Sequence, residues 1–296
     1  MKVVVALGGN AISRRGEAMT IDSQRRNIRD VAPVLAAVAR EQQLVITHGN
    51  GPQVGQLALH NHDGYPLDVL GAETQGLIGY LIEIEMRAAM APDQMLTTVL
   101  TLAEVDADDP AFANPTKFVG PVYREDQTRA LQAQYGWTFA LDGNDWRRVV
   151  PSPVPRRVVQ IDSVKQLLAA GHMVISTGGG GIPVVRVPEG GVRGVEAVVD
   201  KDASSSVLAS AIDADVYVMA TDADAVQLDW GLPTQRAIST ISVDEMSAMD
   251  FAAGSMGPKV TAACDFVRRS GHPAVIGRLS DLEGLLSGAV GTTIIP

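Results

Sequence analysis

The sequence predicts an α/β fold in which a mostly parallel sheet is covered by helices. Short β-branched and apolar runs alternate with longer stretches that carry a helical stripe of apolar residues. Glycine clusters follow several of the short runs, where parallel strands turn into loops or helices. The 296 residues, 46% of them hydrophobic, suffice for one large α/β domain or for two lobes.

The predicted strands share short runs rich in valine, isoleucine and leucine. They are Lys2–Leu7, Leu44–His48, Thr97–Leu102, Met173–Thr177, Val216–Thr221 and Ala274–Gly277. The amphipathic stretches between them predict helices over Ile21–Arg40, Glu73–Met90, Ser163–Ala170, Asp202–Ile212 and Gly257–Ser270. In the first helix, Ile28, Val31 and Leu35 repeat at the spacing that lines one helix face. Gly171 and Gly271 follow two of these helices, where a left-handed cap is expected.

Residues 114–155 interrupt this alternation. They combine a helix-like stretch, Glu125–Tyr135, with a hairpin-like stretch in which Asp142-Gly143 predicts a type I′ turn. We interpret them as a small subdomain inserted into the sheet order, and a long surface excursion without function is the alternative. Lys117 lies near the start of the segment, in a Pro-Thr-Lys stretch that predicts an exposed loop.

Charge and composition narrow the class of partner. The net charge of −10 disfavours nucleic acid and anionic membranes and favours a small-molecule substrate. No apolar run approaches the length of about 18 residues that a membrane span needs, and no export signal is visible, so we expect a cytoplasmic protein. The single cysteine, Cys264, lies in a helix-like context that favours a buried structural role. The five histidines lack metal-ligand spacing, and we predict no structural metal site.

Three glycine clusters follow predicted strands, namely Gly8-Gly9-Asn10, Gly49-Asn50-Gly51 and Gly178 through Gly181. Glycine lets backbone N–H groups approach an oxyanion, and a following helix adds its positive end. One such cluster alone is commonly a tight turn. Because the carboxyl ends of parallel strands meet at one edge of a sheet, we predict that the three converge on an anion-binding site. The stretch from His48 to Gly55 lacks the spacing of a dinucleotide fingerprint, and the stretch from Gly254 to Val260 is too short for a P-loop.

Two lysines stand at predicted helix starts. Capping explains the aspartates of Asp200-Lys201-Asp202, but a lysine is unfavourable beside the positive end of a helix. Lys259 presents the same conflict after the glycines of residues 254–257. A polyphosphate held between the two lysines resolves both. Asp222 and Asp224 follow the strand Val216–Thr221, where a ribose contact, a magnesium contact and simple capping remain open.

Taken together, the segments resemble the carbamate kinase branch of the amino acid kinase superfamily. The matching motifs, in order along the chain, are VALGGNA (5–11), THGNGPQVG (47–55), KFVGP (117–121), VPSP (150–153), STGGGGIPV (176–184), EAVVDKD (196–202), TDADAV (221–226) and GSMGPKV (254–260). The set covers essentially the whole chain. The chain departs from the family pattern at Ala203–Ser206, Gln227 and Asp229.

The resemblance implies an open αβα sandwich with a small protruding subdomain at residues 114–155. It implies a carbamate- or carbamoyl phosphate-binding lobe over residues 1–212, a nucleotide-binding lobe over residues 213–296, and a homodimer. The implied activity is carbamate kinase, with ATP or ADP and carbamate or carbamoyl phosphate as small-molecule partners. Mg²⁺ accompanies the nucleotide and rides on its phosphates, so no protein metal ligand is expected.

The resemblance also assigns roles to residues. The implied catalytic residues are Lys117, Lys201, Asp202 and Lys259, with Asp202 orienting the lysines. The implied carbamate and phosphate contacts come from Gly8, Gly9, Asn10, Gly49, Asn50, Gly51, Gly179, Gly180 and Gly181. The implied nucleotide contacts come from Thr221, Asp222, Gly254, Ser255, Met256 and Gly257.

Three other interpretations compete with this one. A kinase for a related small acid, such as an amino acid carboxylate, shares the fold and the lysines. A non-catalytic nucleotide or carbamoyl phosphate sensor is disfavoured because the lysine set is intact. A dehydrogenase built on Gly49-x-Gly51 needs an acidic residue at the end of the next strand, but the strand Thr97–Leu102 comes too late in the sequence, and Lys201 and Lys259 stay unexplained.

Overall fold

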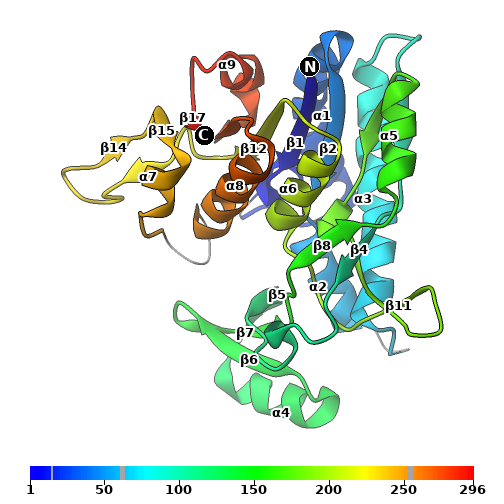
Figure 1. Ribbon diagram of the computed structural model, residues 1–296. Helices are drawn as coiled ribbons and strands as arrows, with labels where there is room; N and C mark the ends of the chain where they lie inside the picture. The colour runs from blue at the N-terminus through cyan, green and yellow to red at the C-terminus, as the bar shows by residue number, and fades with distance from the viewer. Residues whose placement is uncertain (15, 61–63, 252–255) are drawn as a thin grey trace.

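The centre of the molecule is an eight-stranded, mostly parallel sheet (Figure 1). The structure is a computed structural model that describes residues 1–14, 16–60, 64–251 and 256–296. Within these residues the strand order is β15-β17-β16-β12-β1-β2-β9-β3. The strands are β1 (Lys2–Leu7), β2 (Gln43–His48), β3 (Met95–Thr98), β9 (His172–Ile175), β12 (Val216–Thr221), β15 (Thr240–Ser242), β16 (Ala274–Arg278) and β17 (Thr292–Ile295). Only the β16–β17 pairing in this sheet is antiparallel.

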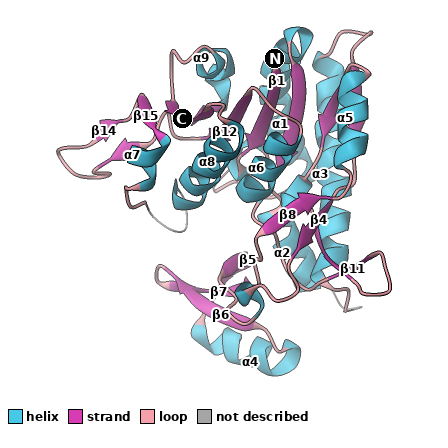
Figure 2. Ribbon diagram, in the orientation of Figure 1, coloured by secondary structure: helices cyan, strands magenta, loops and turns pink. Residues whose placement is uncertain are grey.

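Helices cover both faces of the sheet, so the predicted αβα sandwich is confirmed (Figure 2). One face carries α1 (Ile21–Glu41), α3 (Leu67–Ala89) and α9 (Leu282–Leu286), and the other carries α5 (Ile161–Ala169), α6 (Lys201–Ala211) and α8 (Met256–Ser270). In β1, Val3 and Val5 face the first layer, whereas Val4 and Ala6 face the second. Strand side chains alternate between faces, and both cores are therefore apolar.

The chain leaves the central sheet earlier than the sequence indicates. The predicted strand Thr97–Leu102 is wrong, because β3 ends at Thr98 and β4 (Leu102–Val105) belongs to a second sheet. That sheet has the order β11-β10-β4-β8, with β8 (Pro155–Val158), β10 (Ile182–Arg186) and β11 (Val192–Gly194). At the crossing point, the Thr101 amide donates to the Gln75 side chain in place of a strand partner.

Helix α2 (Gly51–His60) was not predicted, and α3 begins six residues before the expected start. The Gly-Pro start of α2 and its internal Gly55 look like a loop in sequence. In the structure, a Cβ on Gly55 would lie 2.1 Å from the backbone of Gly120, so glycine is required where α2 packs against the strand that contains Gly120. The predicted caps are confirmed, since Gly171 and Gly271 have φ of +86° and +70°.

Residues 117–150 form a small separate sheet with the order β5-β7-β6, which Figure 1 shows extending away from the central sheet. Its strands are β5 (Lys117–Tyr123), β6 (Thr138–Asp142) and β7 (Asp145–Val150), and α4 (Glu125–Tyr135) is the predicted helix. Of the two loop residues between β6 and β7, only Gly143 has a positive φ, so the type I′ prediction is wrong. Lys117 begins β5 and does not lie in a loop.

The remaining elements are short. They include β13 (Gln227–Leu228), β14 (Arg236–Ala237) and α7 (Val243–Ser247). The two predicted lobes share the central sheet, in which β1 of the first pairs with β12 of the second. Among the described residues, no helix combines the length and apolar character needed to cross a membrane.

Candidate active site

The glycine clusters meet at the carboxyl edge of the central sheet. β1 continues into a short 3-10 helix, η1 (Gly9–Ala11), β2 into α2, and β9 into a second one, η3 (Gly178–Gly180). The first N–H groups of such helices have no partner within the helix. Gly8 differs from its neighbours, because its amide donates to the Ala220 carbonyl (3.0 Å) and extends the β1–β12 pairing. The Gly8 amide is therefore engaged within the sheet, and the predicted ligand contact of Gly8 stays a prediction.

Three side chains converge at the start of α6. The Lys201 Nζ lies 2.5 Å from Asp202 Oδ1, and the Lys259 Nζ from α8 lies 3.0 Å from Asp202 Oδ2. The two lysine side chains are 14% and 15% exposed and the aspartate side chain 7%. Lys201 is therefore not the solvated residue that a purely capping function of this helix start predicts. Gly49 lies beneath it, with Lys201 Cδ 3.3 Å from the position of a Cβ on that glycine.

The charges of this cluster support one another. Burial raises the pKa of the Asp202 carboxyl, but the two lysines outweigh it and hold that pKa well below its usual range. Burial lowers the pKa of Lys201 to about 8, against the opposing pull of Asp202. Burial also acts on Lys259, whose pKa nevertheless rises because of Asp202. At neutral pH the cluster therefore holds two ammonium groups on one carboxylate, with an excess positive charge.

A second ion pair lies beside the first. The Lys117 Nζ from β5 lies 2.5 Å from Asp200 Oδ2. Asp200 is also the N-cap of α6, as its other oxygen accepts from the amides of Asp202 and Ala203. The sequence places Lys117 and Asp200 83 residues apart, and the fold brings them together at one helix terminus.

The Gly178–Gly181 turn is packed from two sides. A Cβ on Gly179 would lie 2.2 Å from the Asn50 side chain, and one on Gly180 would lie 2.4 Å from the Val199 carbonyl. The amides of Gly180 and Gly181 donate to Thr177 O and Gly178 O within the turn. These two amides are thus engaged within the turn, and the predicted ligand contacts of Gly179, Gly180 and Gly181 stay predictions.

The chain is similar to known proteins over nearly its whole length. A family model described as the amino acid kinase family matches residues 1–278. The chain belongs to the amino acid kinase family. The carbamate kinases of Rhizobium meliloti (strain 1021) and Escherichia coli (strain K12) are 50% and 51% identical to it, over 99% of this chain and 93% and 98% of their own lengths. A solved structure of carbamate kinase from Giardia lamblia bound to AMP-PNP is 38% identical, with a TM-score of 0.90 over 99% of this chain and 98% of that one.

Buried polar side chains support the cluster in this amino acid kinase, and the sequence analysis missed them. The Tyr217 hydroxyl donates to the Asp202 carbonyl (3.0 Å), and the Ser205 hydroxyl donates to the Lys201 carbonyl (2.6 Å). Gln75 of α3 donates to the Gly178 carbonyl (2.8 Å) and so holds the glycine turn. Tyr217 and Gln75 lie in stretches that otherwise have the pattern of a strand and of a helix core. Ser205 lies in the Ala203–Ser206 stretch that departs from the family pattern, but that departure did not indicate its contact with the Lys201 carbonyl.

The predicted nucleotide contacts lie at two neighbouring chain segments. Thr221 ends β12, and its hydroxyl donates to the Asp222 carboxylate (3.1 Å). Met256 and Gly257 begin α8, three and two residues before Lys259. Gly254 and Ser255 lie outside the described residues. The backbone of Asn10 is described within η1, and its side chain is outside the described part of the structure.

The described carboxylates of this site are not arranged to hold a metal ion on their own. In the described ranges, no group of three His, Cys, Asp or Glu side chains is arranged to hold a metal ion. Both oxygens of Asp202 are bonded to lysines, and both oxygens of Asp200 accept hydrogen bonds. These two carboxylates are thus already engaged within the protein.

His48 at the end of β2 predicts a pH-dependent stability. Burial lowers its pKa to about 4, Lys201 acts in the same direction, and the hydrogen bond with the Gly49 carbonyl opposes them. The pKa of His48 is lower in the folded than in the unfolded protein. The contribution of His48 to the free energy of unfolding is therefore fully present above about pH 6.5, and about 3 kcal/mol of it is lost as the pH falls toward 4. Thermal denaturation of wild type and His48→Asn across this range tests this. The variant should show a shallower fall in Tm, while His60→Gln, at an exposed position, keeps the wild-type slope.

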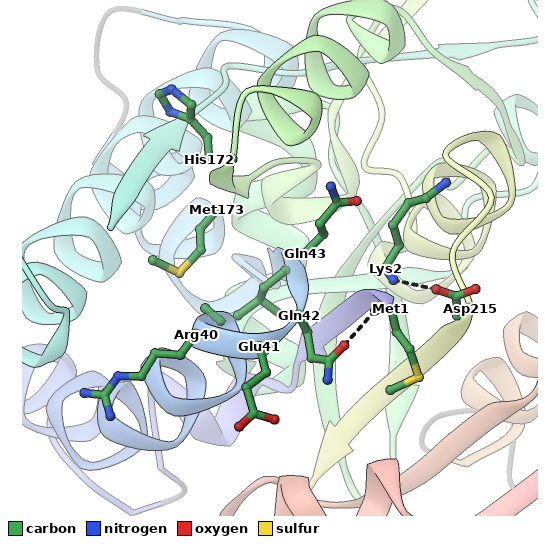
Figure 3. A pocket seen from close by; sticks show the side chains of 12 residues that line it. Met1, Lys2, Arg40, Glu41, Gln42, Gln43, His172, Met173 and Asp215 are labelled. Atoms are coloured by element: carbon green, nitrogen blue, oxygen red, sulfur yellow. Dashed lines mark hydrogen bonds between the residues drawn. The ribbon is translucent and has the colours of Figure 1, made fainter. Parts of the chain in front are cut away.

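A surface hollow of about 520 Å³ lies at the opposite edge of the sheet, where strands begin (Figure 3). Its lining includes Met1, Gln43, His172 and Asp215. Figure 3 shows the Lys2 amide donating to Asp215 and the amino terminus donating to Gln42. None of Lys201, Asp202 and Lys259, which form the lysine cluster, lines this hollow, and we do not assign the hollow to the reaction.

Proposed function

We propose that this enzyme transfers a phosphoryl group reversibly between ATP and carbamate, giving ADP and carbamoyl phosphate. The observation that carries the proposal is the buried pair of lysines on one carboxylate, at a glycine-lined strand edge, in a chain half identical to carbamate kinases over nearly its full length. ATP synthesis from carbamoyl phosphate is the direction we propose for its use.

The chemistry needs positioning and neutralisation of charge. In the synthetic direction a β-phosphate oxygen of ADP forms a bond to the phosphorus of carbamoyl phosphate. The bond from that phosphorus to the carbamate oxygen breaks, and carbamate leaves with the electron pair. The transferred group carries charge on its three equatorial oxygens, and the transition state is loose. Lys201, Lys259 and Lys117 supply positive charge to these oxygens, while Asp202 fixes the first two lysines in place.

Each substrate is assigned to one side of the lysine cluster. Gly9, Asn10, Asn50 and the α2 terminus at Gly51 would hold carbamate and phosphate oxygens on the side of β1 and β2. Thr221, Asp222, Met256 and Gly257 would contact the nucleotide, a role supported by the AMP-PNP bound to the related Giardia lamblia enzyme. Mg²⁺ would enter as the nucleotide complex and supply further charge neutralisation on the phosphates.

The assembly and location of the enzyme are also proposals. We propose a homodimer in the cytoplasm, supported by the family resemblance. Light scattering on the purified protein is expected to give twice the chain mass of 31.2 kDa, and a mass of one chain would contradict the dimer.

Substrate preference tests the proposed function. We expect kcat/KM for ATP formation from carbamoyl phosphate to be at least about 10-fold above that from acetyl phosphate or aspartyl phosphate. The carbamoyl NH₂ group donates hydrogen bonds that an acetyl methyl cannot, and aspartyl phosphate carries charges beyond the acyl group. A coupled assay that detects ATP formation from ADP, Mg²⁺ and each acyl phosphate measures these kcat/KM values. An equal or higher value for the amino acid acyl phosphate would favour the related small-acid kinase, and binding without turnover would favour a sensor.

A further inference from the structure

The two carboxylate oxygens of Asp200 accept hydrogen bonds from two different parts of the molecule. Oδ1 accepts hydrogen bonds from the amides of Asp202 (2.9 Å) and Ala203 (3.1 Å) at the start of α6. Oδ2 accepts a hydrogen bond from the ammonium of Lys117, with 2.5 Å between Nζ and Oδ2. One carboxylate therefore joins the helix terminus that carries Lys201 and Asp202 to the first residue of β5 in the subdomain.

Lys117 needs such a partner in order to hold one position. Its side chain is 36% exposed, and a lysine side chain without a partner samples many rotamers. Burial raises the pKa of the Asp200 carboxyl, but the charge and hydrogen bond of Lys117, together with the charge of Lys201, outweigh this effect, so the net shift is downward. Asp200 is therefore ionised at neutral pH and attracts the Lys117 ammonium to the start of α6.

Other contacts hold the subdomain backbone independently of Asp200. The Val198 amide donates to the Pro151 carbonyl (3.0 Å), next to Val150, which pairs with Lys117 between β7 and β5. The Arg148 guanidinium lies 3.5 Å from the Glu196 carboxylate. Loss of the Asp200 charge is therefore expected to release the Lys117 side chain while the strand that carries it stays in place.

We propose that Asp200 is a positioning residue that holds the Lys117 ammonium beside the lysine cluster, ready to contact the transferred phosphoryl group. Because Oδ1 of Asp200 caps α6, the Lys117 ammonium is held at the same helix turn that carries Lys201 and Asp202. The inference rests on the proposed function, in which Lys117 neutralises charge on that group. Asp200 itself touches no reacting atom in this account.

A double-mutant cycle tests the inference, using wild type, Asp200→Asn, Lys117→Ala and the double variant. Asparagine caps helices as well as aspartate does but lacks the charge that attracts lysine. We expect Asp200→Asn to lower kcat by about 10-fold to 100-fold, with the KM for ADP and the Tm close to wild type. In the Lys117→Ala background the same change should lower kcat by less than about two-fold, because there is no ammonium left to position.

The cycle separates the possible outcomes. A wild-type kcat for Asp200→Asn, or an equal loss in both backgrounds, would overturn the positioning role. Asp215→Asn is the matched control, since Asp215 accepts a backbone amide from Lys2 at the opposite edge of the sheet, and its kcat should stay at the wild-type value. Turnover of carbamoyl phosphate by the wild type tests the proposed function separately, so either claim can fail without the other.

Discussion

Replacing Asp202 with asparagine is expected to lower kcat by about 10³-fold. The carboxylate holds two lysines, 2.5 and 3.0 Å from its two oxygens, and an amide cannot orient both ammonium groups. Losing a single preorganised donor costs about 10²-fold to 10³-fold in kcat, and here two donors are misplaced together. Steady-state kinetics at saturating carbamoyl phosphate and ADP measure the loss, at a temperature below the Tm of both proteins.

The buried carboxylate of Glu85 provides the matched control. It is 3% exposed and accepts from Arg25 and Arg29, so it also holds two cations, but between α1 and α3. Glu85→Gln should lower the free energy of unfolding by about 2 kcal/mol and leave kcat unchanged. If Asp202→Asn behaved as Glu85→Gln does, with lower stability and unchanged kcat, Asp202 would be a structural residue only.

Replacing Lys117 with alanine is expected to lower kcat by about 10²-fold, while the affinity for ADP changes little. Lys117 comes from the subdomain and supplies charge to the transferred group in addition to Lys201 and Lys259. The Tm should stay close to wild type, because the lost ion pair with Asp200 is partly exposed and such pairs contribute at most about 1 kcal/mol. Kinetics and ADP titration calorimetry on the same preparation measure both quantities.

Lys165→Ala controls for the loss of a positive charge, since Lys165 is exposed on α5. This variant should match wild type in kcat and in ADP affinity. A wild-type kcat for Lys117→Ala would remove the subdomain from the mechanism, and residues 114–155 would then be a surface excursion without a catalytic role.

The fold could be predicted largely because its central strands are apolar on both faces and glycine clusters follow several of them. Such strands alternate with amphipathic helices, and this pattern is typical of parallel sheets. It also predicted that Lys201 and Lys259 share one site, since both begin helices near the carboxyl edge of the sheet. The exit of the chain after Thr98 could not be predicted, because a buried side chain of α3, Gln75, replaces the strand partner at Thr101.

The partners of charged residues were harder to predict than the residues themselves. Asp200 has the signature of a helix cap in the sequence, and the structure confirms the cap. Its second bond, to Lys117, joins residues 83 positions apart and depends on how the subdomain packs. Tyr217 lies in an ordinary apolar strand, and only the packing of α6 on β12 brings its hydroxyl to the Asp202 carbonyl.

The transfer itself can be observed by ³¹P NMR of the enzyme with carbamoyl phosphate, ADP and Mg²⁺. We predict that carbamoyl phosphate is consumed with one γ-phosphate of ATP formed for each molecule lost, at a rate that falls about 10³-fold in Asp202→Asn. Consumption that yields inorganic phosphate without ATP, or equal ATP formation by the Asp202→Asn variant, would contradict phosphoryl transfer at this lysine cluster.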